Sequence, residues 1–328
     1  MKRILISVVL VAICLSSFAQ QQEEKKKFQI KGQPIVTVFA NYHAGIGRAN
    51  KESGFALDRA YLGYQFSLTE KLGGKVVFDM GSTKVSGSDL ERVAYVKNAM
   101  LTWKTGNFSL DFGLIGLEQF NVQEKFWGYR YIMKSFQDEY KFGSSADMGI
   151  LGKYKFTKWL SADVTISNGE GYKKLNGDNK YRYAAGVTVT PLESLTLRTY
   201  YDLASKNVED DDTKDQQNLA FFAGYKHKLF SIGAEYNQMF NTKYKEDKDQ
   251  SGYSVYSTVK LEEKFNIFGR YDNLSSKDDW SSADGQRILV GLQYAPIKQL
   301  KIAPNFSTWN PRDGESSSFV YLNIEFKL

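Results

Sequence analysis

The sequence predicts an all-β protein, a closed antiparallel transmembrane β-barrel of sixteen strands. Three observations support this fold class. Short segments of alternating apolar and polar residues recur along the chain, short and long connections alternate between them, and the last segment keeps its apolar face to the final residue. Lipid favours closure because every backbone N–H and C=O within the hydrocarbon must be paired, and an open sheet edge leaves some unpaired.

The start of the chain has the features of a secretory signal peptide. Lys2 and Arg3 precede an apolar run, and residues 17–19 (SFA) supply a small-x-small cleavage site, so residues 1–19 are expected to be removed. An N-terminal membrane anchor is the alternative, but the apolar run is short for a membrane span. The only cysteine, Cys14, leaves with the signal, so neither disulfides nor cysteine-bound metals are expected in the mature chain.

The composition of the rest of the chain argues against helical membrane spans. Mean hydropathy is −0.42, while aromatic residues make up 15% of the sequence. A soluble all-β sandwich or solenoid and an outer-membrane barrel both fit, because a barrel strand shows an apolar residue to lipid only at every second position. Residues 20–33 (QQQEEKKKFQIKGQ) are predicted to form a charged periplasmic leader, and residues 34–328 the barrel.

Alternation with a period of two residues predicts sixteen strands. They are residues 34–43, 55–68, 75–80, 93–103, 108–117, 147–156, 160–166, 181–190, 195–203, 218–226, 230–240, 253–261, 265–273, 287–295, 300–307 and 319–328. Within 93–103, Lys97 and Leu101 share one face, so this segment fits neither parity and is expected to contain a bulge.

The connections between these segments alternate in length without exception. This alternation of short and long connections is typical of an outer-membrane barrel with short periplasmic turns and long extracellular loops. The topology of a Greek-key sandwich does not require it. The short ones are 69–74, 104–107, 157–159, 191–194, 227–229, 262–264 and 296–299, and the long ones are 44–54, 81–92, 118–146, 167–180, 204–217, 241–252, 274–286 and 308–318.

The last segment, FVYLNIEFKL, is expected to face lipid with its apolar side and to pair with both its predecessor and the first strand. An alternating C-terminal strand of this kind also resembles the signal that the barrel-insertion machinery reads, although it ends in Leu328 rather than in an aromatic residue. Outer-membrane lipid, lipopolysaccharide and that machinery are therefore the expected partners of the barrel surface.

A barrel of sixteen strands is wide enough to leave an aqueous lumen. Residues 118–146 form the longest connection and are rich in aromatic residues, so we expect them to fold into the lumen and narrow it; a cap outside the barrel is the alternative. Lys125, Arg130 and Lys134 are the basic candidates on this constriction loop.

Strand parity places more basic than acidic side chains in the lumen, and charges that line a low-dielectric channel enrich their counter-ions. The inward acids are Asp79, Asp111, Asp163, Asp202, Glu235, Asp272 and Glu325. The inward basic residues proposed to line the pore are Arg59, Lys75, Lys153, Arg182, Arg198, Lys226, Arg270 and Arg287, and Lys155, Lys260, Lys301 and Lys327 share their parity.

The sequence gives no sign of catalysis. His43 and His227 are the only histidines, and no GxSxG, HExxH, EF-hand or P-loop pattern is present, so no enzyme activity, cofactor or metal is expected. The net charge of +6 does not indicate nucleic-acid binding, because the basic residues are spread over strands and leader.

The segments LDRAYLGYQF, LDFGLIGLEQF and FWGYRYIMKSFQDEYKFGSSADMGI resemble Bacteroidota outer-membrane porins related to the phosphate-selective porin O and P family. The likeness runs over much of the mature chain and is sharpest from 55 to 155. It implies a sixteen-stranded porin and a homotrimer, with Arg59 and Arg130 at matching basic positions.

Together these features predict an outer-membrane porin for passive diffusion of small hydrophilic solutes, leaning toward anions, with phosphate among them. Two alternatives remain open at this stage. One is a soluble secreted all-β carbohydrate-binding protein, and the other is a structural or adhesive barrel whose loops close the pore.

Overall fold

The computed structural model describes residues 30–47, 51–82, 92–174, 180–205 and 213–328. The predicted signal peptide and nearly all of the predicted leader lie outside the described residues. None of the helices in the described part is long and apolar enough to cross a membrane.

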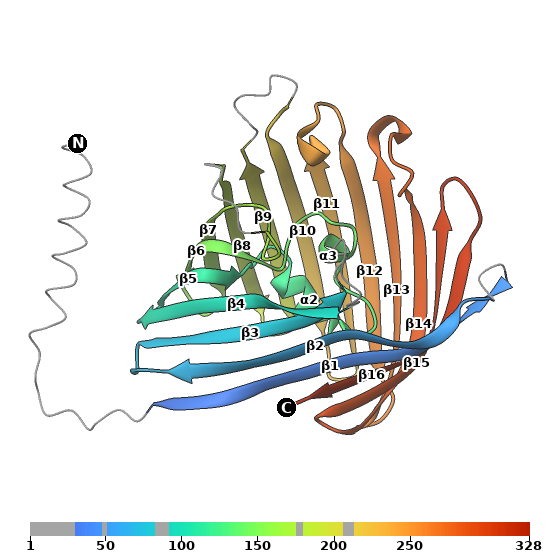
Figure 1. Cartoon of the computed structure of the whole chain (residues 1–328), viewed down its shortest axis with the longest axis horizontal. Helices are drawn as coiled ribbons and strands as arrows, with labels where there is room; N and C mark the ends of the chain where they lie inside the picture. Colours follow the sequence, from blue (N-terminus) through green and yellow to red (C-terminus); the bar gives the residue numbers. More distant parts are fainter. Residues whose placement is uncertain (1–29, 48–50, 83–91, 175–179, 206–212) are drawn as a thin grey trace, which may run out of the picture.

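The described residues form sixteen antiparallel strands in one closed barrel, which confirms the predicted fold class (Figure 1). Each strand pairs with its neighbours in sequence, and β1 pairs with β16 to close the sheet. The strands are β1 (Lys31–Ile46), β2 (Ser53–Ser67), β3 (Leu72–Ser82), β4 (Arg92–Thr105), β5 (Phe108–Gly116), β6 (Ala146–Lys155), β7 (Leu160–Ser167), β8 (Arg182–Leu192), β9 (Leu195–Ala204), β10 (Gln216–Lys226), β11 (Phe230–Phe240), β12 (Gln250–Lys260), β13 (Phe265–Ser276), β14 (Gly285–Ile297), β15 (Leu300–Pro311) and β16 (Ser317–Lys327).

The two faces of the barrel wall differ as the alternation predicts. In β16, Val320 and Leu322 are 43% and 41% exposed on the outside, whereas Asn323 is 3% exposed on the inside. The same pattern holds around the barrel, since Val164 and Val290 are exposed while Asp202 and Asp272 are fully buried. The outer face is therefore apolar enough to contact lipid, and the polar side chains of the strands face inward.

The register between paired strands shifts at four places in the described sheet, and two of these shifts place β-bulges on β2 and β4. The register between β3 and β4 shifts after Val77, which leaves Lys97 as the extra residue and confirms the predicted bulge. The register between β1 and β2 shifts after Phe39, which leaves Asp58 as the extra residue. A bulge changes the direction of the side chain next to it. Asp58 and Lys97 both face inward, where they contact Asn41 and Tyr61.

The short connections lie at the end of the barrel that holds the C-terminus (Figure 1). They are residues 68–71, 106–107, 156–159, 193–194, 227–229, 261–264 and 298–299. Of the long connections, 117–145, 241–249, 277–284 and 312–316 are fully described; the other four lie partly or wholly outside the described residues. The short 3-10 helices η2 (Thr242–Tyr244) and η3 (Lys277–Asp279) belong to two of these long connections.

The first strand begins three residues earlier than predicted. Lys31 is the partner of Ser67, and Gln33 is the partner of Gln65, so residues 31–33 belong to the sheet and not to the leader. The reason lies in β2, which continues to Ser67 and offers backbone groups that need a partner.

The connection between β5 and β6 enters the barrel and carries two short helices, α2 (Asn121–Trp127) and α3 (Phe136–Glu139) (Figure 1). This confirms the prediction that the longest connection folds into the lumen. We call residues 117–145 the constriction loop.

Closure makes the last strand essential for assembly. We predict that deleting residues 317–328 prevents insertion, because the deletion leaves the edges of β1 and β15 unpaired in lipid. Heat-modifiable migration of the protein in outer-membrane fractions measures the outcome. The variant Leu328→Ala keeps all of β16 and serves as control. Normal insertion of the truncated chain would contradict the closure argument.

Candidate functional site in the barrel lumen

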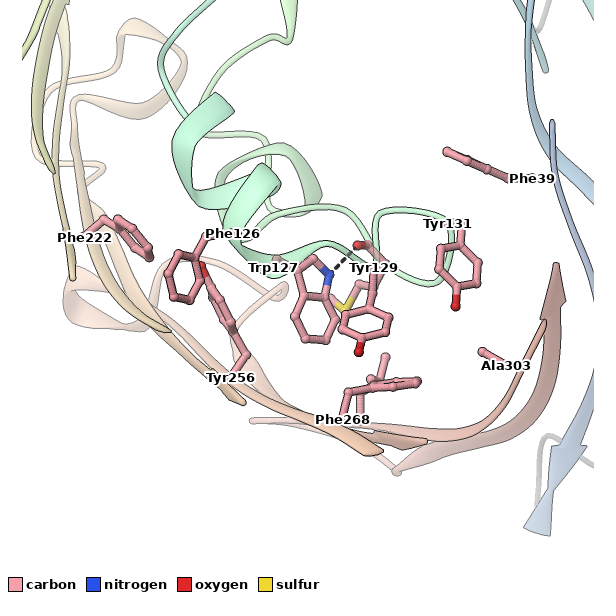
Figure 2. Close-up of a cluster of buried hydrophobic side chains, with 11 residues drawn as sticks. Phe39, Phe126, Trp127, Tyr129, Tyr131, Phe222, Tyr256, Phe268 and Ala303 are labelled. Carbon is pink, nitrogen blue, oxygen red and sulfur yellow. Dashed lines mark hydrogen bonds between the residues drawn. The ribbon is translucent and has the colours of Figure 1, made fainter. Parts of the chain in front are cut away.

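The constriction loop packs its aromatic side chains against one side of the barrel wall (Figure 2). The ring centroid of Tyr129 lies 4.4 Å from that of Phe268 on β13, and the ring of Phe126 lies 5.3 Å from that of Phe222 on β10. Trp127 is 2% exposed, and its indole N–H donates to the Met133 carbonyl oxygen at 2.9 Å. The loop therefore has a hydrophobic core of its own, which the wall completes.

Glycines in the wall make room for these rings. A Cβ at Gly224 on β10 would lie 2.5 Å from the Phe126 ring, and a Cβ at Gly252 on β12 would overlap the ring of Phe136. Only a residue without a side chain allows the loop to approach the sheet so closely. Glycines at these positions therefore allow the loop to pack directly against the wall from β10 to β12.

Two buried arginines tie the loop backbone to the wall. Arg270 on β13 donates two hydrogen bonds to Asp272, at 2.7 and 2.8 Å, and a third at 2.6 Å to the Lys134 carbonyl oxygen of the loop. Arg198 on β9 binds Asp163 and donates to the Glu118 carbonyl oxygen at 2.9 Å. These arginines are each 4% exposed, and we call them the anchoring arginines.

The placement of three predicted basic residues differs from the expectation that they line the open pore. Arg198 and Arg270 bind the backbone of the constriction loop, and Arg182 on β8 is buried in an ion pair with Asp202 at 2.8 Å. All three lie on the inner face, as parity predicts. Their charges are compensated by wall carboxylates, so they contribute little to the field in the water-filled part of the lumen.

The opposite side of the lumen, from β2 to β4, carries basic side chains outside ion pairs. Lys97 on β4 donates to the Tyr61 hydroxyl at 3.2 Å. Lys75 on β3 lies within electrostatic range of one carboxylate, Asp111, and of three other lysines, Lys97, Lys125 and Lys153. Across the described residues, no ion pair involves Lys75, Lys97 or Lys125. We call these three lysines the basic cluster; Lys125 belongs to α2, so the cluster joins wall and loop.

Charged pairs surround the basic cluster. Arg59 on β2 binds Asp79 at 2.8 Å, and Lys153 on β6 binds Asp111 at 3.0 Å and lies 3.5 Å from Glu118. The Arg59 pair is neutral, and Lys153 with its two carboxylates carries one net negative charge, so the three lysines of the cluster leave this half of the lumen net positive.

Arg130 fixes the tip of the constriction loop. Its guanidinium binds Glu124 and also Asp138, the latter at 2.7 Å. Burial by itself would raise the pKa of Asp138, but Arg130 and Lys134 outweigh burial and hold that pKa below its usual value. Asp138 is therefore ionised at neutral pH, and the tip stays closed on itself.

The other predicted residues occupy the borders of the lumen. The Lys226 ammonium lies 4.7 Å from the Phe126 ring centroid, and Arg287 lies 5.2 Å from the Trp309 ring centroid while donating to Ser307 at 3.3 Å. Lys134 and Arg287 line the same lumen cavity. Sequence reasoning missed Lys97, since a bulge hides its direction; the loss of alternation in 93–103 was the available signal.

Two cavities open within the lumen. One has a volume of about 330 Å³ and lies between the loop tip and strands β1, β2 and β14 to β16. The other has a volume of about 260 Å³ and lies beside the short connection 68–71, where Lys75, Asp111 and Lys153 line it. Both cavities are lined by charged and polar side chains, which suits water and hydrophilic solutes.

The two histidines lie in different parts of the barrel. His227 lies in the short connection 227–229, and His43 contacts the Asn41 side chain at 3.0 Å. Within the described ranges, no group of three or more His, Cys, Asp or Glu side chains could hold a metal ion.

The chain belongs to the Gram-negative porin family, whose model matches residues 7–328. No curated protein matches the sequence. Among solved structures, the outer-membrane channel DcaP of Acinetobacter baumannii is similar, with a TM-score of 0.66 at 13% identity over 93% of this chain and 99% of that chain.

Two further structures share the fold. The anion-selective porin from Comamonas acidovorans has a TM-score of 0.66 at 11% identity, over 92% of this chain and 100% of that chain. The trimer form of in-vitro folded OmpT of Vibrio cholerae has a TM-score of 0.62 at 12% identity, over 92% of this chain and 100% of that chain. At such identities the likeness establishes the fold alone.

Fold and family together define an outer-membrane channel for small solutes, and not an enzyme. An outer-membrane location excludes the alternative of a soluble carbohydrate-binding protein. The solute preference and the assembly are a separate question.

The anchoring role of Arg270 gives a stability prediction. Arg270→Gln leaves the buried Asp272 carboxylate without its partner, so we expect the free energy of unfolding to fall by about 3–5 kcal/mol. Urea unfolding from lipid vesicles, followed by tryptophan fluorescence, measures it. The double variant Arg270→Gln, Asp272→Asn removes both charges and should recover a large part of the loss. Equal losses in both variants would show that the charge pair is not the cause.

Proposed function

We propose that this porin passes small hydrophilic solutes by passive diffusion and favours anions, phosphate among them. The single observation that supports this most strongly is the basic cluster, three lysines at the constriction loop that form no ion pair among the described residues. An anion that enters this half of the lumen meets uncompensated positive charge. A cation meets repulsion in a space where the low-dielectric wall weakens screening.

The anchoring arginines support the proposal indirectly. They form ion pairs with Asp163 and Asp272, two of the inward acids that would otherwise attract cations. Arg59 and Arg130 also border the open lumen, and although each is in an ion pair through one nitrogen, its guanidinium has further N–H donors for an oxyanion. The resemblance to phosphate-selective porins points the same way, as does the anion-selective porin among the structural neighbours.

The open cavities beside the loop tip and beside the short connection 68–71 favour a channel over a closed structural barrel. In this proposal the short connections face the periplasm and the long ones the cell exterior, as in other barrels of this type. Residues 1–19 act as a signal peptide, and the mature chain assembles as a homotrimer. The trimer form of OmpT supports the assembly only by likeness of fold.

The sign of ion selectivity tests the proposed function. Across a tenfold KCl gradient at low mean concentration, we expect a zero-current potential of the sign that anion preference produces. The preference should fade as salt rises, because the Debye length is about 10 Å at 0.1 M and shorter above. A cation-selective sign at low salt would refute the proposal.

The double variant Lys75→Gln, Lys97→Gln identifies the source of the preference. It should move the zero-current potential toward cation selectivity without changing the barrel, whereas Lys228→Gln in a short connection should leave the potential unchanged. If the double variant and Lys228→Gln have the same zero-current potential, the basic cluster does not set the ion selectivity.

A further inference from the structure

We propose that the cavity of about 330 Å³ beside the loop tip binds short zwitterionic peptides. Their ammonium group would lie toward Asp58 and Glu139, and their carboxylate toward Arg287 and Lys134, all of which line the cavity. The cavity lies nearer to the long connections, since Asp58 and Arg287 follow soon after the starts of β2 and β14. The proposal rests on the proposed function only in that the cavity must open on the solute path.

This cavity is bordered by charges of both signs that form no ion pair. Asp58 accepts a hydrogen bond from the Asn41 amide at 2.7 Å and lies within electrostatic range of Arg92 and Arg59. Within the described part of the chain, neither Asp58 nor Glu139 forms an ion pair. Arg287 and Lys134 likewise have no carboxylate within ion-pair distance among those residues. Elsewhere in the wall, buried charges such as Arg270 and Asp272 are tightly paired.

These four charges border the same space. Tyr321 on β16 lines the cavity and lies within electrostatic range of Arg287, Asp58 and Glu139. Opposite charges that border one cavity without forming an ion pair can each bind an oppositely charged group of a solute. A solute with one charge of each sign satisfies both, whereas a simple anion satisfies one and is repelled by the other.

The spacing of the charges also fits a short peptide. Asp58 is on β2 and Arg287 on β14, and β1, β16 and β15 lie between them. Four interstrand steps of about 4.8 Å span about 19 Å along the wall, less the curvature of the barrel and the reach of the two side chains. An extended tripeptide covers at most about 10 Å between its ends. That length suits the remaining gap better than a single amino acid does.

A set of amides lies between the acidic and basic ends of the cavity. The Asn305 amide donates to the Asn323 side-chain oxygen at 2.7 Å, and Asn323 donates to the Tyr131 carbonyl oxygen at 3.2 Å. Asn305 and Asn323 are 7% and 3% exposed, and both line the cavity. Their amides therefore form the polar middle of the site, which a peptide backbone would face.

The experiment uses three peptides of equal length on the unmodified channel in a planar bilayer. Trialanine is zwitterionic, N-acetyl-trialanine is an anion, and trialanine amide is a cation. We expect trialanine added on the side of the long connections to interrupt the current with an apparent Kd at least tenfold lower than that of either capped peptide. Equal interruption by all three, or interruption by the acetylated anion alone, would overturn the proposal.

Two variants locate the site. Asp58→Asn should weaken trialanine binding about tenfold, to the level of N-acetyl-trialanine, and Arg287→Gln should weaken it to the level of trialanine amide. Heat-modifiable migration confirms that each variant is folded. Undiminished trialanine binding in both folded variants would refute the site.

The outcomes for the two proposals are separate. The zero-current potential of the same membranes reports anion preference. Lys75→Gln in the basic cluster should change that potential and leave the trialanine Kd unchanged. An anion-selective channel without tighter trialanine binding refutes the peptide site alone. A cation-selective channel that still binds trialanine at least tenfold more tightly refutes the proposed anion preference alone.

Discussion

Backbone pairing within the hydrocarbon is the constraint on which the rest of this structure depends. It forces the sheet to close between β1 and β16, and closure fixes the inside and outside of every strand. Apolar side chains then take the lipid side, and the polar ones share a single interior. With sixteen strands that interior is too wide for wall side chains to fill. The constriction loop occupies part of the space, and the remainder is the channel.

The loop can occupy that space because the wall is asymmetric. From β10 to β15 the inner face offers rings, small residues and the buried Arg270, which together receive the aromatic side of the loop. From β2 to β4 it offers Lys75 and Lys97, which form no ion pair among the residues described. One half of the wall therefore holds the loop, and the other half sets the electrostatic potential that a solute meets.

Much of this organisation could be predicted from the sequence, because period-two alternation and the rhythm of the connections are local signals. They predicted the strand count, the inward constriction loop and the inner face of Arg198 and Arg270. They did not show that these arginines are buried in ion pairs, because Asp163 lies 35 positions from Arg198 and pairing depends on strand register. Lys97 was missed for a related reason, since a bulge reverses parity at the position where it matters. The charges around the peptide cavity come from β2, β14 and the loop, so only the closed barrel brings them together.

The central claim is that the constriction loop covers the wall near Phe268 and leaves the wall near Lys97 open to solute. Cysteine accessibility tests this directly, since the only native cysteine, Cys14, lies in the predicted signal peptide. Lys97→Cys and Phe268→Cys place one thiol on each side of the lumen. A charged methanethiosulfonate reagent added to an open channel should rapidly change the current of Lys97→Cys, and it should leave that of Phe268→Cys unchanged. Equally fast modification of both thiols would show that the loop does not cover the wall, and it would contradict this account.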